Sequence, residues 1–213
     1  MTQRTILFDL DGTLSDSAPG IFASIEYAFN EMHLPFPGRA YHLLGPPLKE
    51  IFAMLQVPDE RLAEAITHYR ARYHTVGLFE NTVYEGIPEL LSDLVENGDR
   101  LALATSKPDV YATRILEHFG LANCFTFIGG ASLDGVRGEK AGVVEHTLKH
   151  LGDIDLTNTV MVGDRYHDVR GAAVHGVETI GVLWGYGDRA ELNDAGARLL
   201  VETPTELGYI LVG

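Results

Sequence analysis

The chain has 213 residues, of which 46% are hydrophobic, so it can bury one sizeable core and a smaller accessory domain beside it. Sixteen Lys and Arg residues against thirty Asp and Glu residues give a formal net charge of -14, which argues against a nucleic acid polymer or an anionic membrane surface as a partner. The N-terminus shows no signal-peptide pattern and no apolar run is long enough to span a membrane, so we expect a cytoplasmic protein.

The chain begins with an apolar stretch, TILFDL, that predicts a buried strand. Residues 15–85 then have helical periodicity without a convincing strand, and prolines separate the helical pieces (17–33, 47–55 and 59–77). This pattern predicts a small all-α domain, residues 15–85, inserted directly after the first strand.

From residue 86 onward, short apolar runs alternate with helical segments. The apolar runs, which suit strands buried on both faces, are 100–105, 125–130, 159–163, 177–184 and 197–202. The helical segments between them are 87–97, 109–119, 139–151, 167–176 and 189–196, and glycines close several of these. Alternation of this kind predicts an α/β domain, residues 1–14 and 86–213, with a Rossmann-like parallel sheet covered by helices on both sides.

Polar side chains gather where the predicted strands end. In an open parallel sheet these carboxyl ends form the rim at which ligands bind, so the polar side chains should meet there. They are Asp9 and Asp11 after the first strand, Thr105 and Ser106 after the second, Lys140 after the third, and Asp164 with Asp168 after the fourth.

Carboxylates gathered at one rim repel each other, and a bound divalent cation usually offsets this repulsion. Oxygen ligands alone favour Mg²⁺, for which we name Asp9, Asp11 and Asp164, with Asp168 orienting them without contacting the ion. We interpret His167, which lies between the last two acids, as a solvated residue and not as a ligand.

The cation would let a carboxylate approach a phosphate dianion. Asp9 is then the candidate nucleophile that forms an aspartyl-phosphate, and Asp11 is the candidate acid and base. Thr105, Ser106 and Lys140 would bind the phosphoryl oxygens. Each motif alone has an ordinary structural explanation, such as a turn at Asp-Gly or a helix cap at Thr-Ser, and only their combination carries the hypothesis.

The motifs DLDGTL, the strand ending in Thr105-Ser106, Lys140 and GDRYHD (163–168) together resemble the four motifs of the haloacid dehalogenase superfamily, over nearly the whole chain. The helical insert resembles that superfamily's C1 cap. The resemblance implies a Mg²⁺-dependent phosphoaspartate mechanism, in which the backbone carbonyl of Asp11, more often than its side chain, contacts the metal. Asp11 also argues for phosphoryl transfer, because the dehalogenases lack this second aspartate.

Two further stretches, LLGPPL (43–48) and TIGVLWGYGDRAEL (179–192), resemble the phosphoglycolate phosphatase branch, which includes 5′-nucleotidase-like members. The expected function is therefore a phosphoglycolate phosphatase-like hydrolase of a small phosphorylated metabolite. The alternatives are a 5′-nucleotidase, a phosphomutase, against which Ile21 argues because the mutases typically carry histidine there, and a catalytically silent phosphate-binding regulator.

Substrate choice is expected to rest with the inserted domain. Its candidate specificity residues are Arg39, Gly45, Pro46 and Lys49. Trp184 and Tyr186, at the end of the strand predicted at 177–184, could line the site or fill the core. The oligomeric state stays open between a monomer and a homodimer.

Overall fold

The computed structural model describes residues 3–213, which form two compact units. Within the described residues, the first unit is 3–15 with Val83–Gly213, and the second is the continuous segment Asp16–Thr82. Two short strands, β2 (Ser15–Asp16) and β3 (Thr82–Val83), pair with each other where the chain passes between the units. The assignment of residues 15–85 as a cap and of the remainder as a catalytic core stays a prediction.

The first unit is built on a six-stranded parallel sheet in the order β5-β4-β1-β6-β7-β8. Its central strand β1 pairs with β4 on one side and β6 on the other, in register from Thr5 to Phe8. The strands are β1 (Thr5–Phe8), β4 (Arg100–Pro108), β5 (Phe127–Ala131), β6 (Thr159–Gly163), β7 (Glu178–Val182) and β8 (Leu199–Val201).

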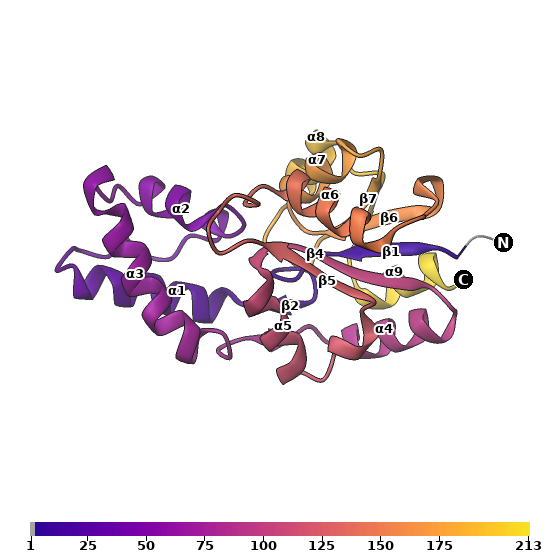
Figure 1. Cartoon of the computed structure of the whole chain (residues 1–213), viewed down its shortest axis with the longest axis horizontal. Coiled ribbons are helices and arrows are strands. Elements are labelled where there is room, and N and C mark those ends of the chain that lie inside the picture. Colours follow the sequence, from indigo (N-terminus) through magenta and orange to yellow (C-terminus); the bar gives the residue numbers. More distant parts are fainter. Residues whose placement is uncertain (1–2) are drawn as a thin grey trace. The chain divides into compact units, whose positions relative to one another are not determined.

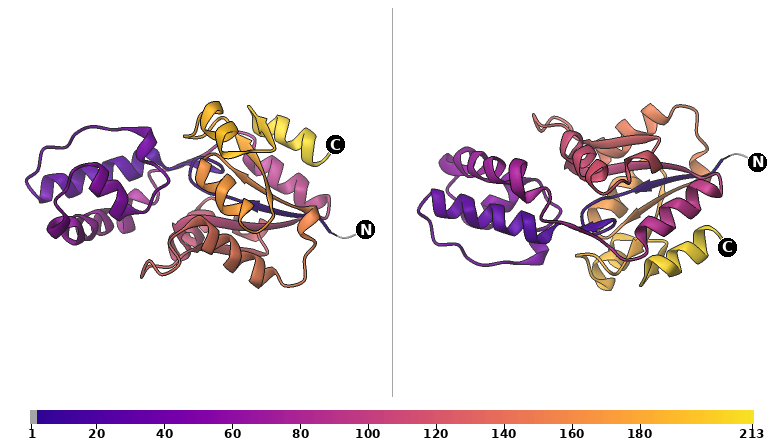
Figure 2. Two further views of the ribbon diagram at one scale, coloured as in Figure 1. Left: turned by 90° about the horizontal axis from the view of Figure 1, so that it is seen from above. Right: turned by 90° about the horizontal axis from the view of Figure 1, so that it is seen from below.

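Helices cover both faces of this sheet, as Figures 1 and 2 show. The helices α4 (Ile87–Glu96), α5 (Asp109–His118) and α9 (Pro204–Leu211) lie over one face. The helices α6 (Lys140–Leu151), α7 (Tyr166–Ala173) and α8 (Arg189–Ala195) lie over the other. The predicted α/β fold, a parallel sheet covered by helices on both sides, is therefore confirmed.

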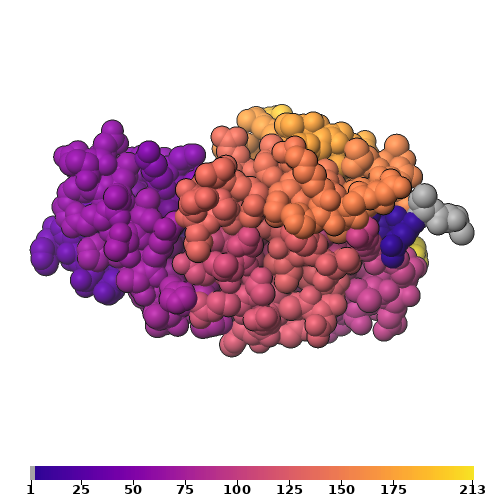
Figure 3. Space-filling view, in the orientation of Figure 1, coloured from indigo at the N-terminus to yellow at the C-terminus, as the bar shows by residue number. Residues whose placement is uncertain are grey.

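The sheet is buried because its strands are apolar on consecutive positions, so both faces can be covered. All four residues of β1 and all five of β6 are buried. A core cluster that includes Leu7, Met161, Val143 and Ala172 joins the sheet to α6 and α7. On the face drawn in Figure 3, later segments of the chain cover most of the indigo N-terminal strand.

The second unit is helical. Its elements are α1 (Ala18–Glu31), α2 (Leu48–Met54), α3 (Leu62–Arg72), the 3₁₀ turns η1 (Tyr41–Leu43) and η2 (Asp59–Arg61), and the π-helical turn η3 (Tyr73–Gly77). Tyr69 and Tyr73 are buried and stacked, with ring centroids 5.1 Å apart, so they belong to this unit's core and not to a binding surface. A Cβ on Gly20 would lie 2.0 Å from the carbonyl oxygen of Gly77, so α1 and η3 approach each other closely only because Gly20 lacks one.

Along residues 3–213, no helix is both long enough and apolar enough to cross a membrane. The longer strands and helices agree with the predicted segments to within a few residues, but the sequence analysis did not predict α9 or the two short strands β2 and β3. The N-terminus of α9 carries an ordinary helix signal, because the side chain of Thr203 accepts a hydrogen bond from the backbone N–H of Glu206 and Pro204 follows directly.

Candidate active site

Three carboxylates from the segments that follow two neighbouring strands, β1 and β6, meet at the carboxyl edge of the sheet. Asp9 follows β1, Asp164 follows β6, and Asp168 lies in the first turn of α7. One carboxylate oxygen from each lies within 4.8 Å of the others, and all three residues are buried. Because β1 and β6 are adjacent and parallel, the residues that follow them necessarily lie side by side.

Lys140 lies among these acids at the first position of α6. Its Nζ is 2.8 Å from Oδ1 of Asp9 and 2.7 Å from Oδ1 of Asp168, and it donates a hydrogen bond to the carbonyl oxygen of Ala104 at 2.9 Å. A Cβ on Gly171 would lie 2.6 Å from Cγ of Lys140, so the lysine stem packs directly on the backbone of α7. The ammonium is thus fixed between two of the three carboxylates.

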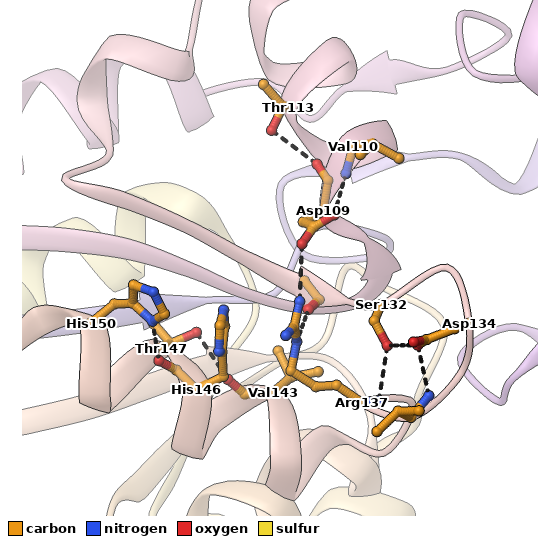
Figure 4. Close-up of polar contacts among 12 residues, drawn as sticks. Asp109, Val110, Thr113, Ser132, Asp134, Arg137, Val143, His146, Thr147 and His150 are labelled. Atoms are coloured by element: carbon orange, nitrogen blue, oxygen red, sulfur yellow. Dashed lines mark hydrogen bonds and ion pairs between the residues drawn. The ribbon is translucent and has the colours of Figure 1, made fainter.

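The loop that precedes Lys140 is held by Arg137, as Figure 4 shows. The Arg137 guanidinium donates to the carbonyl oxygen of Gly130 at 2.7 Å and pairs with Asp109 at 2.9 Å, which ties the loop to the end of β5 and the start of α5. Ser132 is hydrogen-bonded to Asp134 and accepts from the backbone N–H of Arg137. These contacts give α6, and with it Lys140, a defined starting point.

The other predicted residues of the rim lie in the same unit, but Asp11 has a different partner. Its Oδ1 lies 2.7 Å from Nζ of Lys107, whose side chain is almost fully buried. Thr105 is buried at the end of β4 and its hydroxyl accepts a hydrogen bond from the backbone N–H of Lys107 at 3.3 Å, while Ser106 is half-buried. The carboxylate cluster therefore consists of Asp9, Asp164 and Asp168, without the side chain of Asp11.

Glycine at position 12 lets the first motif reach Asp164. Gly12 has a φ of 85°, and a Cβ there would lie 2.2 Å from Oδ2 of Asp164, so only glycine satisfies both the turn and the close approach. Thr13 then donates from its hydroxyl to Oδ1 of Asp164 at 3.2 Å. The Asp-Gly-Thr turn is therefore part of the site and not an unrelated surface turn.

Charge repulsion and burial act together on these acids. Burial raises the pKa of the Asp164 carboxyl well above its ordinary value, and the charges of Asp168 and Asp9 raise it further. Burial likewise raises the pKa of Asp168 to about 6, against the opposing charge of Lys140. Burial lowers the pKa of Lys140, but the two flanking carboxylates outweigh it and the net shift is upward, so the lysine stays charged.

The three carboxylates form a group that could hold a metal ion. Oδ1 of Asp9 and Oδ1 of Asp168 are buried and accept no hydrogen bond from the described residues, although each lies at ion-pair distance from Lys140. A single ammonium cannot neutralise three buried carboxylates, and a divalent cation would remove the repulsion that raises the pKa of Asp164. Oxygen is the sole donor type in the group, which suits a hard cation.

His167, interpreted from the sequence as a solvated residue, is half-buried. Its Nε2 is buried without a hydrogen-bond partner among the described residues, and its ring lies on that of Tyr166, with centroids 3.8 Å apart. Burial lowers the pKa of His167 to about 4, so the imidazole is neutral near physiological pH.

The sequence analysis missed an ion pair behind Asp164. Nε of Arg165 donates to Oε1 of Glu191 at 2.7 Å, and the backbone N–H of Tyr166 donates to the same oxygen at 2.9 Å. Arg165 was visible as part of GDRYHD, but nothing in the sequence pairs it with a residue of α8. Lys107 was visible as the residue after Thr105-Ser106, yet its pairing with Asp11 depends on the irregular end of β4.

The candidate specificity residues all belong to the second unit. Arg39 is exposed and lies 3.9 Å from Glu26, and Lys49 is exposed in the first turn of α2. Gly45, with a φ of 116°, and Pro46 form the turn between η1 and α2. Their contribution to substrate choice stays a prediction.

Comparison with known proteins identifies the family of the chain. The family model for haloacid dehalogenase-like hydrolases matches residues 6–182, which include Asp9, Asp164 and Asp168. The chain belongs to this family. The resemblance seen in the four motifs is therefore confirmed.

Among named relatives, the tyrosine-protein kinase PtkA of Mycobacterium tuberculosis is 47% identical over 90% of this chain, which spans only 65% of that protein's length. A 5′-nucleotidase of Pseudomonas aeruginosa is 44% identical over 88% of this chain and 86% of its own length. The crystal structure of a predicted phosphatase from Clostridium acetobutylicum is 40% identical, with a TM-score of 0.93 over 100% of this chain and 99% of that one.

Proposed function

We propose that this protein is a Mg²⁺-dependent phosphatase that hydrolyses small phosphorylated metabolites through an aspartyl-phosphate on Asp9. The observation that carries the proposal is the pairing of Asp9 with Lys140 inside a cluster of three buried carboxylates at the carboxyl edge of the sheet. Such a cluster destabilises the fold unless cations occupy it, and a structural role gives no reason to assemble it.

The residues divide the chemistry among them. Asp9 attacks phosphorus with one carboxylate oxygen, and the bond to the ester oxygen breaks as that oxygen takes a proton from Asp11. Asp11 then accepts a proton from the water that attacks the aspartyl-phosphate, releasing inorganic phosphate and restoring the Asp9 carboxylate. Lys140 and Thr105, with Ser106 beside them, stabilise the charge on the transferred phosphoryl oxygens.

Asp9, Asp164 and the backbone carbonyl of Asp11 would hold Mg²⁺, while Asp168 keeps Lys140 in place through the 2.7 Å ion pair. When bound, the ion would supply positive charge that offsets the repulsion between a dianionic ester and the carboxylates of the site. Asp168 also accepts from the backbone N–H of Arg165 at 3.0 Å, which fixes the first turn of α7.

For the substrate, two classes of ester merit the first tests. The motifs LLGPPL and TIGVLWGYGDRAEL favour a phosphoglycolate-like substrate, and the 44% identical 5′-nucleotidase favours nucleoside monophosphates. A panel of phosphorylated metabolites that includes phosphoglycolate and 5′-nucleotides, assayed for phosphate release, distinguishes them. We place nucleoside monophosphates first, because that relative matches this chain over 86% of its own length.

The class of reaction is tested with a generic aryl phosphate. The wild-type protein should release phosphate over many turnovers with Mg²⁺, and EDTA or Asp9→Asn should abolish release. Asp153→Asn changes an exposed aspartate outside the four motifs. It serves as the matched control and should retain full turnover. Normal turnover by Asp9→Asn would overturn the mechanism, and binding of phosphate without turnover would favour a silent regulator.

A second candidate function is phosphoryl transfer to tyrosine, favoured by the 47% identity to PtkA. An aspartyl-phosphate can pass its phosphoryl group to a phenol in place of water, so both activities would need Asp9 and the same carboxylate cluster. Incubation with ATP labelled on the γ-phosphate separates them: a phosphatase releases labelled phosphate, whereas a kinase leaves stable label on tyrosine.

A further inference from the structure

We infer that the β7–α8 connection (residues 183–188) is a positioning element for the metal-holding carboxylate Asp164, and that Trp184 and Gly185 set the affinity of the site for Mg²⁺. This inference rests on the proposed function, because it assigns Asp164 to the metal. The connection lies outside the four motifs.

The connection makes a polar contact with each of the two loops that form the site. The indole N–H of Trp184 donates to the carbonyl oxygen of Thr13 at 3.0 Å, and the backbone N–H of Tyr186 donates to Oδ2 of Asp164 at 2.7 Å. Thr13 in turn donates to Oδ1 of the same carboxylate. Both carboxylate oxygens of Asp164 therefore accept a hydrogen bond, one from the first motif and one from the connection. The hydrogen bond from Trp184 to Thr13 joins the connection to the first motif.

Two glycines allow the connection to lie directly on the site. A Cβ on Gly185 would lie 2.3 Å from the carbonyl oxygen of Gly12 and 2.4 Å from Cβ of Asp164. A Cβ on Gly187 would lie 2.0 Å from the carbonyl oxygen of Asp164. These obstacles are backbone atoms and a Cβ, which cannot rotate away, so any side chain at position 185 must displace the loop that carries Asp164.

The start of α8 also contacts the loop that carries Asp164. Asp188 caps this helix by accepting from the backbone N–H of Glu191 at 2.8 Å, and the Glu191 carboxylate binds Arg165 and the backbone of Tyr166. Arg165 follows Asp164 directly and is buried. The chain from 184 to 191 therefore holds the Asp164 loop on both sides, which a connection serving only to reach the next strand would not need to do.

The test measures Mg²⁺ binding to the full chain, not only activity. Trp184 is the single tryptophan of the sequence, so its emission should change on Mg²⁺ addition to the wild type, and calorimetry gives the affinity of every variant. Gly185→Ala should weaken Mg²⁺ binding about 10-fold or more, as loss of a group that orients a metal ligand does. Trp184→Phe, which keeps an aromatic ring and loses the N–H, should weaken it roughly 3- to 10-fold.

The matched control is Gly208→Ala in α9, where an added Cβ meets only an ordinary contact, 3.5 Å from Leu90. Its Mg²⁺ affinity should equal that of the wild type. Thermal unfolding in EDTA is recorded for each variant, since a positioning role predicts weaker binding without a matching loss of stability. Trp184→Phe decides the question if Gly185→Ala does not fold.

Unchanged Mg²⁺ affinity in Trp184→Phe, or a loss that merely follows a lower melting temperature, would overturn the inference while the phosphatase function stands. A wild type that binds Mg²⁺ tightly and loses that binding in the variants, yet hydrolyses no ester, would overturn the function and support the inference. A wild type that binds no Mg²⁺ would overturn both.

Discussion

At the scale of single residues, two buried lysines form ion pairs with aspartates of the site. Lys140 pairs with Asp9 and Asp168, and Lys107 pairs with Asp11. Each of the two aspartates of the first motif therefore has its own ammonium partner. This separation matches the separate roles proposed for them, one as nucleophile and one as acid and base.

Lys107 should accordingly matter to turnover. Lys107→Met keeps the length of the stem and removes the charge, so the Asp11 carboxylate loses the contact at 2.7 Å that holds its orientation. We expect kcat to fall by about 10- to 100-fold with a smaller effect on Mg²⁺ affinity, as for other residues that orient a reacting group. Lys149→Met, at an exposed lysine paired with Glu145, is the control and should leave kcat unchanged. Equal kcat in the two variants would contradict a role for Lys107.

The residues that could be predicted from the sequence are those whose position follows from a strand end. Asp9, Thr105 and Asp164 each follow an apolar run, so the parallel sheet alone brings them together. Lys107, Trp184 and Glu191 could not be placed in this way, because their partners lie on other segments and their contacts depend on side-chain direction. Gly12 and Gly185 read as turn glycines in the sequence, and only the structure shows the carboxylate against which they pack.

At the scale of elements, the helical unit depends on Arg72 at the end of α3. Its guanidinium makes two contacts with Glu80, at 2.6 and 2.8 Å, and donates to the hydroxyl of Ser24 in α1 at 3.2 Å. It therefore joins α1 to α3 and to the segment that leads out of the unit. The hydrogen bond from Arg72 lowers the pKa of Glu80 below its ordinary value.

Glu80→Gln should lower stability near neutral pH by about 0.5 kcal/mol, because the pair is partly exposed and solvent screens it. The native pKa of Glu80 is depressed, so its stabilising contribution is present above the pKa of the unfolded chain and is lost as pH falls through the native value. The difference in melting temperature between wild type and variant should therefore shrink in acid. Glu64→Gln removes a similar but exposed contact with Arg61 and should change nothing measurable. A difference that grew in acid would contradict this assignment.

At the scale of the whole molecule, a net charge of -14 opposes the approach of an anionic ester, and only the local cations at the site favour it. Salt screens the distant charges more effectively than the buried ones, since the Debye length is about 8 Å at physiological ionic strength. The long-range repulsion should therefore weaken with salt while the buried ion pairs of Lys140 and Lys107 persist.

Moderate salt should consequently raise kcat/KM for a dianionic ester by up to a few-fold, measured with Mg²⁺ held at saturation throughout. Substrates with one further negative charge should show a steeper rise, which serves as the internal comparison. A steep fall in kcat/KM with salt would instead show that a field of cations, not the net negative charge, governs the encounter.

The central claim is that the Asp9 carboxylate carries the phosphoryl group between substrate and water. Borohydride reduces an acyl phosphate to an alcohol, so quenching the enzyme with borohydride during turnover tests this claim directly. Peptide mass spectrometry should then find homoserine in place of Asp9, only when both substrate and Mg²⁺ are present. Reduction at another acid, or an unmodified Asp9 during demonstrated turnover, would contradict the account.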